Sequence, residues 1–332
     1  MPENTGVLVV GELGEGGLAP ITPELLGIGR KLADGLGQAL AAVLVGGAVA
    51  DTAREAIFYG ADRVYLVEAE VLADYLTDSY VAALEKLNQQ ARPEIMLFGH
   101  TAMGRDLAPA LAFRLGTGVT LDCVGLDLDP ATGLLQKTKP VYGGNAVAVY
   151  VCQEGRPQMA AVRPRAMAPL GRDTTRHGEV IAFDPGIDPS AVRGRVVRKI
   201  REAAVGMKLE EAPVIVCGGR GIGSAEAFKM LEKLAAVLGG TIGATRPPCD
   251  ARWVPDYCQI GLTGKLVAPD LYIGVALSGA SQHVAGMSGS KNILAINKDP
   301  QANIFKVAHF GVVGEYQKVL PAFVEKCREL LS

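Results

Sequence analysis

The 332-residue chain is long enough for about two domains, and its 49% hydrophobic and 20% charged residues are typical of a well-buried globular protein, which excludes a disordered chain. A formal net charge of -2 supplies no long-range field for a polyanion. The densest basic stretch, 193–201, is interrupted by Val196, Val197 and Ile200, and we interpret it as one solvated face of a strand or helix. Composition and charge therefore argue against nucleic-acid binding.

Residues 1–17 lack a basic start followed by an apolar run, and no apolar stretch reaches the ~20 residues that span a bilayer. We therefore expect a cytoplasmic protein without membrane insertion. The six cysteines and four histidines are scattered, with no C-x-x-C spacing. This pattern predicts buried free thiols and no metal site.

The first 115 residues alternate between expected strands and helices. The strands are 6–10, 39–45, 63–67 and 95–98, and the helices are 23–36, 51–59, 79–90 and 105–115. Thr22 is the expected N-cap of the first helix, with Pro23 at its first position. Such alternation favours a parallel sheet with helices on both faces. Three further strands follow without helices and are expected to extend the same sheet in antiparallel fashion: 134–139, 146–153 and 158–162.

Residues 164–209 lose clear periodicity and collect prolines, which indicates a crossing between domains. A second strand–helix–strand pattern follows, with a strand at 213–217, a helix at 224–238 and a strand at 240–244. We therefore predict an α/β protein of two domains, each a mostly parallel sheet with flanking helices. The expected bounds are 1–190 for the first domain, 191–204 for a linker and 205–332 for a Rossmann-like second domain.

A glycine-rich turn, 218–223, lies between the strand at 213–217 and the next helix. Glycines in this place let the backbone approach a pyrophosphate at the helix N-terminus, although a plain strand-to-helix corner has the same appearance. A nicotinamide dinucleotide site also needs an acid about 20 residues further on. The next strand ends instead in Thr245 and Arg246. A basic residue there suits an anion or an electron-rich ring better than a ribose diol. The sequence therefore weakens the prediction of an NAD-dependent oxidoreductase.

The first domain has its own glycine-rich stretch, 11–17, between a strand and a helix. It contains Glu12 and Glu15, whose carboxylates would repel a phosphate. We therefore expect this domain to bind no nucleotide and to serve as scaffold and partner surface. Serines 278, 281, 288 and 290 lie among glycines without a G-x-S-x-G elbow, so no hydrolase site is predicted.

Several C-terminal segments together resemble the alpha subunit of electron transfer flavoproteins. They are Gly218-Gly219-Arg220-Gly221, Gly243-Ala244-Thr245-Arg246, the stretch 259–265 (QIGLTGK), the stretch 278–287 (SGASQHVAGM) and the stretch 295–300 (AINKDP). The N-terminal part is similar too, at 18–20 (LAP) and 141–146 (VYGGNA). The resemblance thus covers nearly the whole chain.

The resemblance implies that the second domain carries FAD and that each segment has a part in holding it. Arg220 would meet the diphosphate or ribityl region, and Thr245 with Arg246 would approach the flavin. The residues expected to line the isoalloxazine ring are Ile260, Gly261, Leu262, Thr263 and Gly264, with the Thr263 hydroxyl near N5. Those expected to cradle the diphosphate and pyrimidine side are Ser278, Gly279, Ala280, Ser281, Gln282 and His283. The adenosine would be framed by Asn297, Glu315 and Tyr316.

Three of these residues are expected to tune the redox potential: Arg246, Thr263 and His283. Arg246 is planar and permanently charged, so it would stabilise the negative charge that a buried flavin ring gains on reduction. His283 would add a proton-dependent contact near the pyrimidine oxygen. Leu262 stands where the family commonly has glutamine, so one polar contact to the ring is missing.

The implied function is an FAD-based electron carrier. It would accept electrons from acyl-CoA dehydrogenases or other flavin dehydrogenases, or exchange them with NADH or a quinone reductase. The implied partner is a beta subunit that holds AMP or a second FAD. The sequence leaves open which dehydrogenase is served and whether the complex bifurcates electrons. Two alternatives remain beside this one: the NAD-dependent oxidoreductase, and a nucleotide-binding regulatory protein without redox chemistry.

Overall fold

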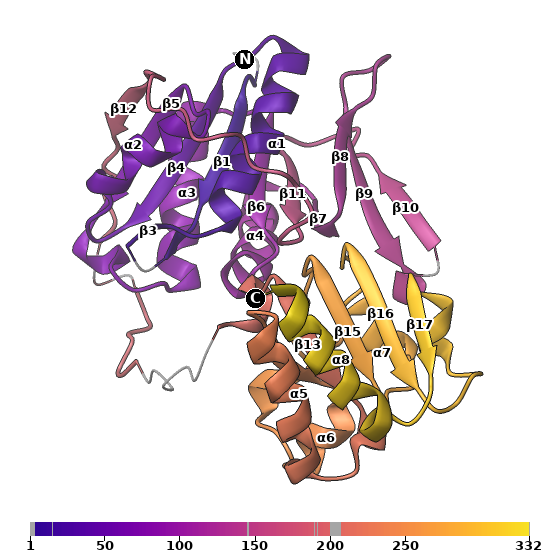
Figure 1. The fold of residues 1–332 in the computed structure, drawn as a ribbon. Helices are drawn as coiled ribbons and strands as arrows, with labels where there is room; N and C mark the ends of the chain where they lie inside the picture. Colours follow the sequence, from indigo (N-terminus) through magenta and orange to yellow (C-terminus); the bar gives the residue numbers. More distant parts are fainter. Residues whose placement is uncertain are drawn as a thin grey trace. The chain divides into compact units, whose positions relative to one another are not determined.

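The computed structural model describes residues 4–14, 16–144, 146–188, 190, 192–199 and 207–331. The chain divides into two compact units, the first of Met1–Pro140 and Val147–Ile200, the second of Val141–Ala146 and Arg201–Ser332 (Figure 1). The short segment 141–146 therefore belongs with the second unit, where its turn η2 (Tyr142–Gly144) lies against α7 (Ser281–Ala285).

The first unit is built on a seven-stranded sheet in the order β12-β5-β4-β1-β6-β11-β7, and its described pairings are parallel. Its strands are β1 (Val7–Gly11), β4 (Leu40–Gly46), β5 (Arg63–Glu68), β6 (Ile95–Gly99), β7 (Val119–Cys123), β11 (Gln158–Val162) and β12 (Glu179–Ala182). Its helices are α1 (Ile21–Leu36), α2 (Ala50–Phe58), α3 (Thr77–Ala91) and α4 (Ala102–Leu115), with a short 3-10 turn η1 (Glu70–Leu72).

Helices cover both faces of this sheet. Alternate residues of each strand point to opposite faces, so each face packs its own hydrophobic cluster against helices. Val7 and Val9 of β1 join one hydrophobic cluster with residues of α1 and α2. Leu8 and Val10 join a second cluster with residues of α3 and α4. The prediction of a parallel sheet covered on both faces is therefore confirmed for this unit.

The predicted antiparallel extension of this sheet is wrong. β9 (Leu135–Val141) pairs with β8 (Gly125–Leu128) and β10 (Ala146–Tyr150) in a separate three-stranded sheet. The strand at 158–162 instead lies inside the parallel sheet, between β6 and β7. Every residue of that strand is buried, as expected for a central parallel strand, whereas most of β10 is exposed.

Three other expectations also need correction. The predicted crossing at 164–209 contains β12, which pairs with β5 and so belongs to the first unit. The described part of the basic stretch, residues 193–199, forms neither helix nor strand. Thr22 does not cap α1, because its buried hydroxyl bonds instead to the backbone N–H and carbonyl of Glu12, at 2.8 and 2.9 Å.

The second unit is built on a five-stranded parallel sheet in the order β14-β13-β15-β16-β17. Its strands are β13 (Val214–Gly218), β14 (Thr241–Ala244), β15 (Leu271–Val275), β16 (Asn292–Asn297) and β17 (Phe310–Val313). Its helices are α5 (Ala225–Val237), α6 (Arg246–Asp250), α7 and α8 (Tyr316–Leu331). Short 3-10 turns are η4 (Leu209–Glu211), η5 (Arg220–Ile222), η6 (Asp256–Cys258) and η7 (Asn303–Lys306).

This strand order reverses direction at β13, since β14 lies on one side of it and β15 on the other. In open parallel sheets, ligands bind outside the carboxyl ends of the strands at such a reversal. The predicted Rossmann-like fold of the second domain is confirmed. Its topology predicts a ligand site at the carboxyl ends of β13 and β15.

Glu12 follows β1, and its carboxyl is turned into the first unit. Its Oε1 accepts a hydrogen bond of 2.7 Å from the Thr101 hydroxyl, which precedes α4. Burial raises the pKa of Glu12 to about 7, although the bond from Thr101 opposes the shift. Glu12 is thus a partly buried acid that accepts a hydrogen bond, whereas we expected a loop carboxylate that repels phosphate. Glu15 lies outside the described residues.

The raised pKa of Glu12 predicts a pH-dependent stability. Ionising this carboxyl is harder in the folded than in the unfolded chain, so its stabilising effect is complete below pH 4.5 and is lost as the pH rises through about 7. Glu12→Gln cannot ionise and keeps an acceptor for Thr101. We expect it to raise the free energy of unfolding at pH 8 by on the order of 2 kcal/mol, with little change at pH 4. Urea unfolding between pH 4 and pH 8 measures this, with the exposed Glu154→Gln as the control that should follow the wild type. Parallel pH profiles of the free energy of unfolding for the wild type and Glu12→Gln would contradict the prediction.

Candidate functional site

A cleft of about 710 Å³ opens at the carboxyl ends of β13, β14, β15 and β16 in the second unit. This volume lies within the range of cofactor pockets in proteins. Each strand is followed by cleft residues: Arg220 after β13, Thr245 after β14, Leu277 after β15 and Asp299 after β16. The cleft thus occupies the place where the strand order reverses.

The cleft brings together most of the site residues predicted from the sequence. Those that line it are Arg220, Thr245, Arg246, Ile260, Gly261, Leu262, Thr263, Ser278, Gly279, Ala280, Gln282, His283 and Asn297. Four predicted residues are not among those that line it: Gly264, Ser281, Glu315 and Tyr316. Seven other residues that line it were not among the predicted site residues: Gly221, Pro247, Gln259, Ala276, Leu277, Asp299 and Ala302.

Structural partners account for three of the residues outside the lining. Tyr316 is buried in the core under α5 and α8, and its hydroxyl donates a 2.7 Å bond to the Ile222 carbonyl. Glu315 pairs with Lys318 at 2.7 Å on the surface. Gly264 closes a turn, with its N–H 3.0 Å from the Gly261 carbonyl.

The glycine-rich turn after β13 packs directly against the turn after β15. A Cβ on Gly219 would lie 2.4 Å from the Ala276 carbonyl oxygen, and one on Gly221 would lie 2.8 Å from it. The two turns are also hydrogen-bonded, from Gly219 N–H to Val275 O and from Gly221 N–H to Ala276 O, at 3.0 and 3.1 Å. Glycine is therefore required here to let two backbone segments meet at the floor of the cleft.

Gln259 and Thr263 face each other across the loop 259–265. The Gln259 side-chain amide donates a 3.0 Å hydrogen bond to the Thr263 hydroxyl oxygen. Since that oxygen accepts, the Thr263 proton can be donated to a group in the cleft. Leu262, between them, is 54% exposed and adds apolar surface. A glutamine four residues before the threonine is the signal that sequence reasoning missed.

Two arginines, Arg220 and Arg246, give the cleft a cationic wall. Arg246 begins α6 and lies 3.3 Å from Asp250 one turn later, and both side chains are more than 60% exposed. Among the described residues that line the cleft, Asp299 is the one carboxylate, and it accepts a bond from the Gln301 N–H and so stabilises a turn. The charge of the wall suits an anionic ligand.

His283 has protein partners on both ring nitrogens. Nδ1 lies 2.9 Å from the Ile260 carbonyl and Nε2 lies 2.6 Å from the Tyr272 hydroxyl. Burial lowers the pKa of His283, so the ring is neutral at ordinary pH. The expected proton-dependent contact to a ligand would therefore require acid conditions.

Asn297, at the end of β16, braces two turns. Its side-chain amide donates to the Leu277 carbonyl at 2.7 Å, and its side-chain oxygen accepts from the Asp299 N–H at 3.0 Å. Asn297 therefore holds the ends of β15 and β16 in register at the cleft.

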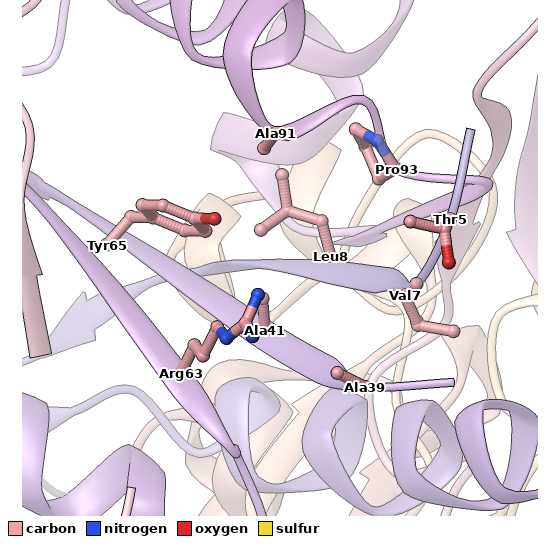
Figure 2. A pocket seen from close by; sticks show the side chains of 10 residues that line it. Thr5, Val7, Leu8, Ala39, Ala41, Arg63, Tyr65, Ala91 and Pro93 are labelled. Atoms are coloured by element: carbon pink, nitrogen blue, oxygen red, sulfur yellow. The ribbon is translucent and has the colours of Figure 1, made fainter. Parts of the chain in front are cut away.

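A second, much smaller pocket lies in the first unit. Its volume is about 90 Å³. Figure 2 shows it near the amino-terminal ends of β1, β4 and β5, with Arg63 as its charged side chain. This is the edge of a parallel sheet opposite to the one where nucleotides bind. The absence of a nucleotide from the first domain stays a prediction.

No helix in the part of the chain that the structure describes is long and apolar enough to cross a membrane. Among the same described residues, no three His, Cys, Asp or Glu side chains come together as metal ligands. All six cysteines are free, and four of them are buried: Cys123, Cys217, Cys249 and Cys258.

Comparison with known proteins gives full-length matches. A family profile described as electron transfer flavoprotein domain matches residues 7–187, and one described as electron transfer flavoprotein FAD-binding domain matches residues 208–288. The electron transfer flavoprotein subunit alpha of Thermoanaerobacterium thermosaccharolyticum is 46% identical, over 99% of this chain and 100% of the relative. That of Megasphaera elsdenii is 41% identical, over 99% and 98%. Protein FixB of Clostridium saccharobutylicum is 41% identical, over 98% and 97%.

The contact between the two strand-end turns predicts a specific sensitivity to a single methyl group. Gly219→Ala places a Cβ within 2.5 Å of backbone and side-chain atoms of Leu277, so the turns must separate. We expect a loss of about 1–3 kcal/mol in the free energy of unfolding of the second unit. Gly118→Ala, whose Cβ would meet nothing within 4 Å, is the matched control. Equal urea midpoints for the two variants would refute the contact.

Proposed function

The chain belongs to the family of electron transfer flavoprotein alpha subunits, and on this basis we propose that its FAD lies in the cleft of the second unit. The observation that carries the proposal is the meeting of thirteen predicted site residues, two arginines among them, in one cleft at the reversal of the strand order. When bound, FAD supplies reversible one- and two-electron redox chemistry. The protein contributes position, charge and exclusion of water.

The phosphate end of the cofactor would be held by the turns after β13 and β15. Gly219 and Gly221 let these turns approach each other, and Arg220 supplies a cation beside them. Ser278, Gly279 and Ala280 form the opposing edge of the cleft. Gly279 has a φ of +79°, and a Cβ there would lie 2.3 Å from the Ile304 N, so this edge also depends on glycine.

The ring end would lie against the loop 259–265. Thr263, oriented by Gln259, would donate its hydroxyl proton to N5, and Leu262 and Ile260 would cover the ring with apolar surface. Thr245 and Arg246 line the cleft after β14. The Arg246 guanidinium would stabilise negative charge on the ring more strongly where water is excluded.

An alpha subunit implies a beta-subunit partner. We propose that the partner holds AMP or a second FAD, and that the complex takes electrons from acyl-CoA dehydrogenases or other flavin dehydrogenases in the cytoplasm. Exchange with NADH or a quinone reductase belongs to the same proposal. An NAD-dependent oxidoreductase is not favoured, because β14 is followed by Thr245 and Arg246, without an acid for the ribose.

A direct test is to purify the heterodimer and identify its nucleotides after denaturation, by absorbance and chromatography. The proposal requires one FAD that depends on this chain. Release of NAD without any flavin would contradict it.

Arg246 offers a test of charge stabilisation. Arg246→Ala removes the cation and leaves the glycine turns, so FAD should still bind while the midpoint potential of its first one-electron step falls. The scale is roughly 40 mV for each kcal/mol of lost stabilisation, and partial exposure of Arg246 points to a shift on the order of tens of mV.

Asp250→Ala is the matched control for Arg246, because it breaks the same surface pair and keeps the cation. If Arg246 served only that pair, both variants would leave the potential unchanged. Spectroelectrochemical titration of the two complexes distinguishes these cases.

Expression of the chain without its partner tests the second half of the proposal. We expect FAD to dissociate more readily from the chain alone and its thermal unfolding to occur at lower temperature, since partner binding stabilises the folded state by mass action. A lone chain that remains a stable monomer and retains stoichiometric FAD through gel filtration would show that the partnership is not obligate.

A further inference from the structure

A buried chain of hydrogen bonds connects the sheet of the second unit to the loop 259–265. The Tyr272 hydroxyl, from β15, lies 2.6 Å from His283 Nε2 in α7, and His283 Nδ1 lies 2.9 Å from the Ile260 carbonyl. Tyr272 is fully buried and His283 is 5% exposed. Tyr272 is not among the residues that line the cleft, whereas His283 and Ile260 are.

The direction of this chain is fixed by its end. The Ile260 carbonyl can only accept, so Nδ1 carries the proton and donates it, which leaves a lone pair on Nε2. The Tyr272 hydroxyl therefore donates to Nε2.

All members of the network remain neutral at physiological pH. Burial raises the pKa of Tyr272 well above its ordinary value and lowers that of His283. Burial also raises the pKa of the Cys217 thiol, 4.0 Å from Nε2, to about 12. The same hydrogen-bond direction thus holds across the working pH range.

The loop that receives this bond is seated tightly on α7. The Leu262 N–H donates to the Gln282 carbonyl at 2.9 Å, and a Cβ on Gly286 would lie 2.5 Å from the Gly261 Cα. Such a close fit leaves little room for the loop to shift without breaking contacts. The bond from His283 secures Ile260, whose N–H bonds to the Ala244 carbonyl at the end of β14 at 2.9 Å.

We propose that Tyr272 is a positioning residue for the flavin-facing loop: its hydroxyl, bonded to Nε2, fixes the orientation of the His283 ring, and the ring in turn holds the Ile260 carbonyl through Nδ1–H. Without the hydroxyl, Nε2 keeps the more distant Cys217 thiol at 4.0 Å, so the ring can turn and its bond to Ile260 weakens. The assignment of the loop to the flavin rests on the proposed function, whereas the network is independent of it.

The network is tested first by nitrogen-15 NMR of the heterodimer containing histidine-labelled chain, with His283→Ala to assign the resonances. In the wild type, His283 should show a protonated Nδ1 and an unprotonated Nε2. Tyr272→Phe, which removes only the hydroxyl, should move the Nε2 resonance toward that of an unbonded nitrogen and the Nδ1–H resonance toward that of a weaker hydrogen bond. An Nδ1–H resonance that is unchanged in Tyr272→Phe would overturn the proposal.

The effect on the loop is tested by FAD binding to the same heterodimers. We expect Tyr272→Phe to weaken FAD binding roughly 3- to 10-fold, the scale of one hydrogen bond. If Tyr272 acts through His283, it should cause no further loss in a His283→Ala background. Tyr80→Phe removes a buried hydroxyl from the first unit and should leave the affinity unchanged.

Additive losses in the double variant, or a wild-type affinity in Tyr272→Phe, would show that Tyr272 only fills the core and would overturn the proposal. If His283→Ala does not fold, the Nδ1–H resonance and the FAD affinity of Tyr272→Phe still decide. A wild-type heterodimer that bound no FAD would refute the proposed function, and the Nδ1–H resonance would still report whether Tyr272 holds the His283 ring.

Discussion

The second unit depends on the close approach of two backbone turns at the carboxyl edge of its sheet. Parallel strands bring their carboxyl ends to one edge, but adjacent turns there normally carry side chains that keep the backbones apart. In this chain Gly219 and Gly221 remove those side chains on one turn, so the backbone lies directly against Ala276 and Leu277 on the other. The close contact of these two turns therefore fixes the positions of Gly221, Ala276 and Leu277, all three of which line the cleft.

The remaining parts of the site are fixed by bonds to this floor or to the sheet behind it. Asn297 connects the turns after β15 and β16, and Gln259 orients Thr263. The network from Tyr272 through His283 secures the loop 259–265 at Ile260. Arg246 differs, because it is exposed and paired with a surface acid. Its effect on a bound flavin therefore depends on the ligand in the cleft and on the partner subunit.

Sequence patterns predicted the fold where the local signal and the tertiary structure agree. The alternating strands and helices of the first domain and the strand–glycine–helix unit at 213–238 are examples, because buried strands and amphipathic helices have distinct periods. The pattern failed at 158–162, where a short apolar run does not reveal its neighbours, and at Thr22, whose hydroxyl is used in a tertiary contact. The local sequence does not reveal which distant strand or backbone group a residue will contact.

The motifs predicted which loops line the candidate site more completely than they predicted what each residue does there. Motif segments identified the loops that meet in the cleft, yet the roles of residues within them depend on distances that no motif states. Gln259 gained a role from its bond to Thr263, and the His283 ring proved to be neutral and bonded on both sides. Tyr316 lies in the core, at hydrogen-bond distance from Ile222.

The roles assigned to the other site residues depend on a flavin that lies in the cleft of the second unit. A crystal structure of the purified heterodimer with its native cofactors tests this placement. We expect an isoalloxazine ring against Ile260–Thr263, with the diphosphate between Arg220 and the Ser278–Ala280 turn. A flavin bound within the first unit, or one whose ring and phosphates both lie outside this cleft, would contradict it.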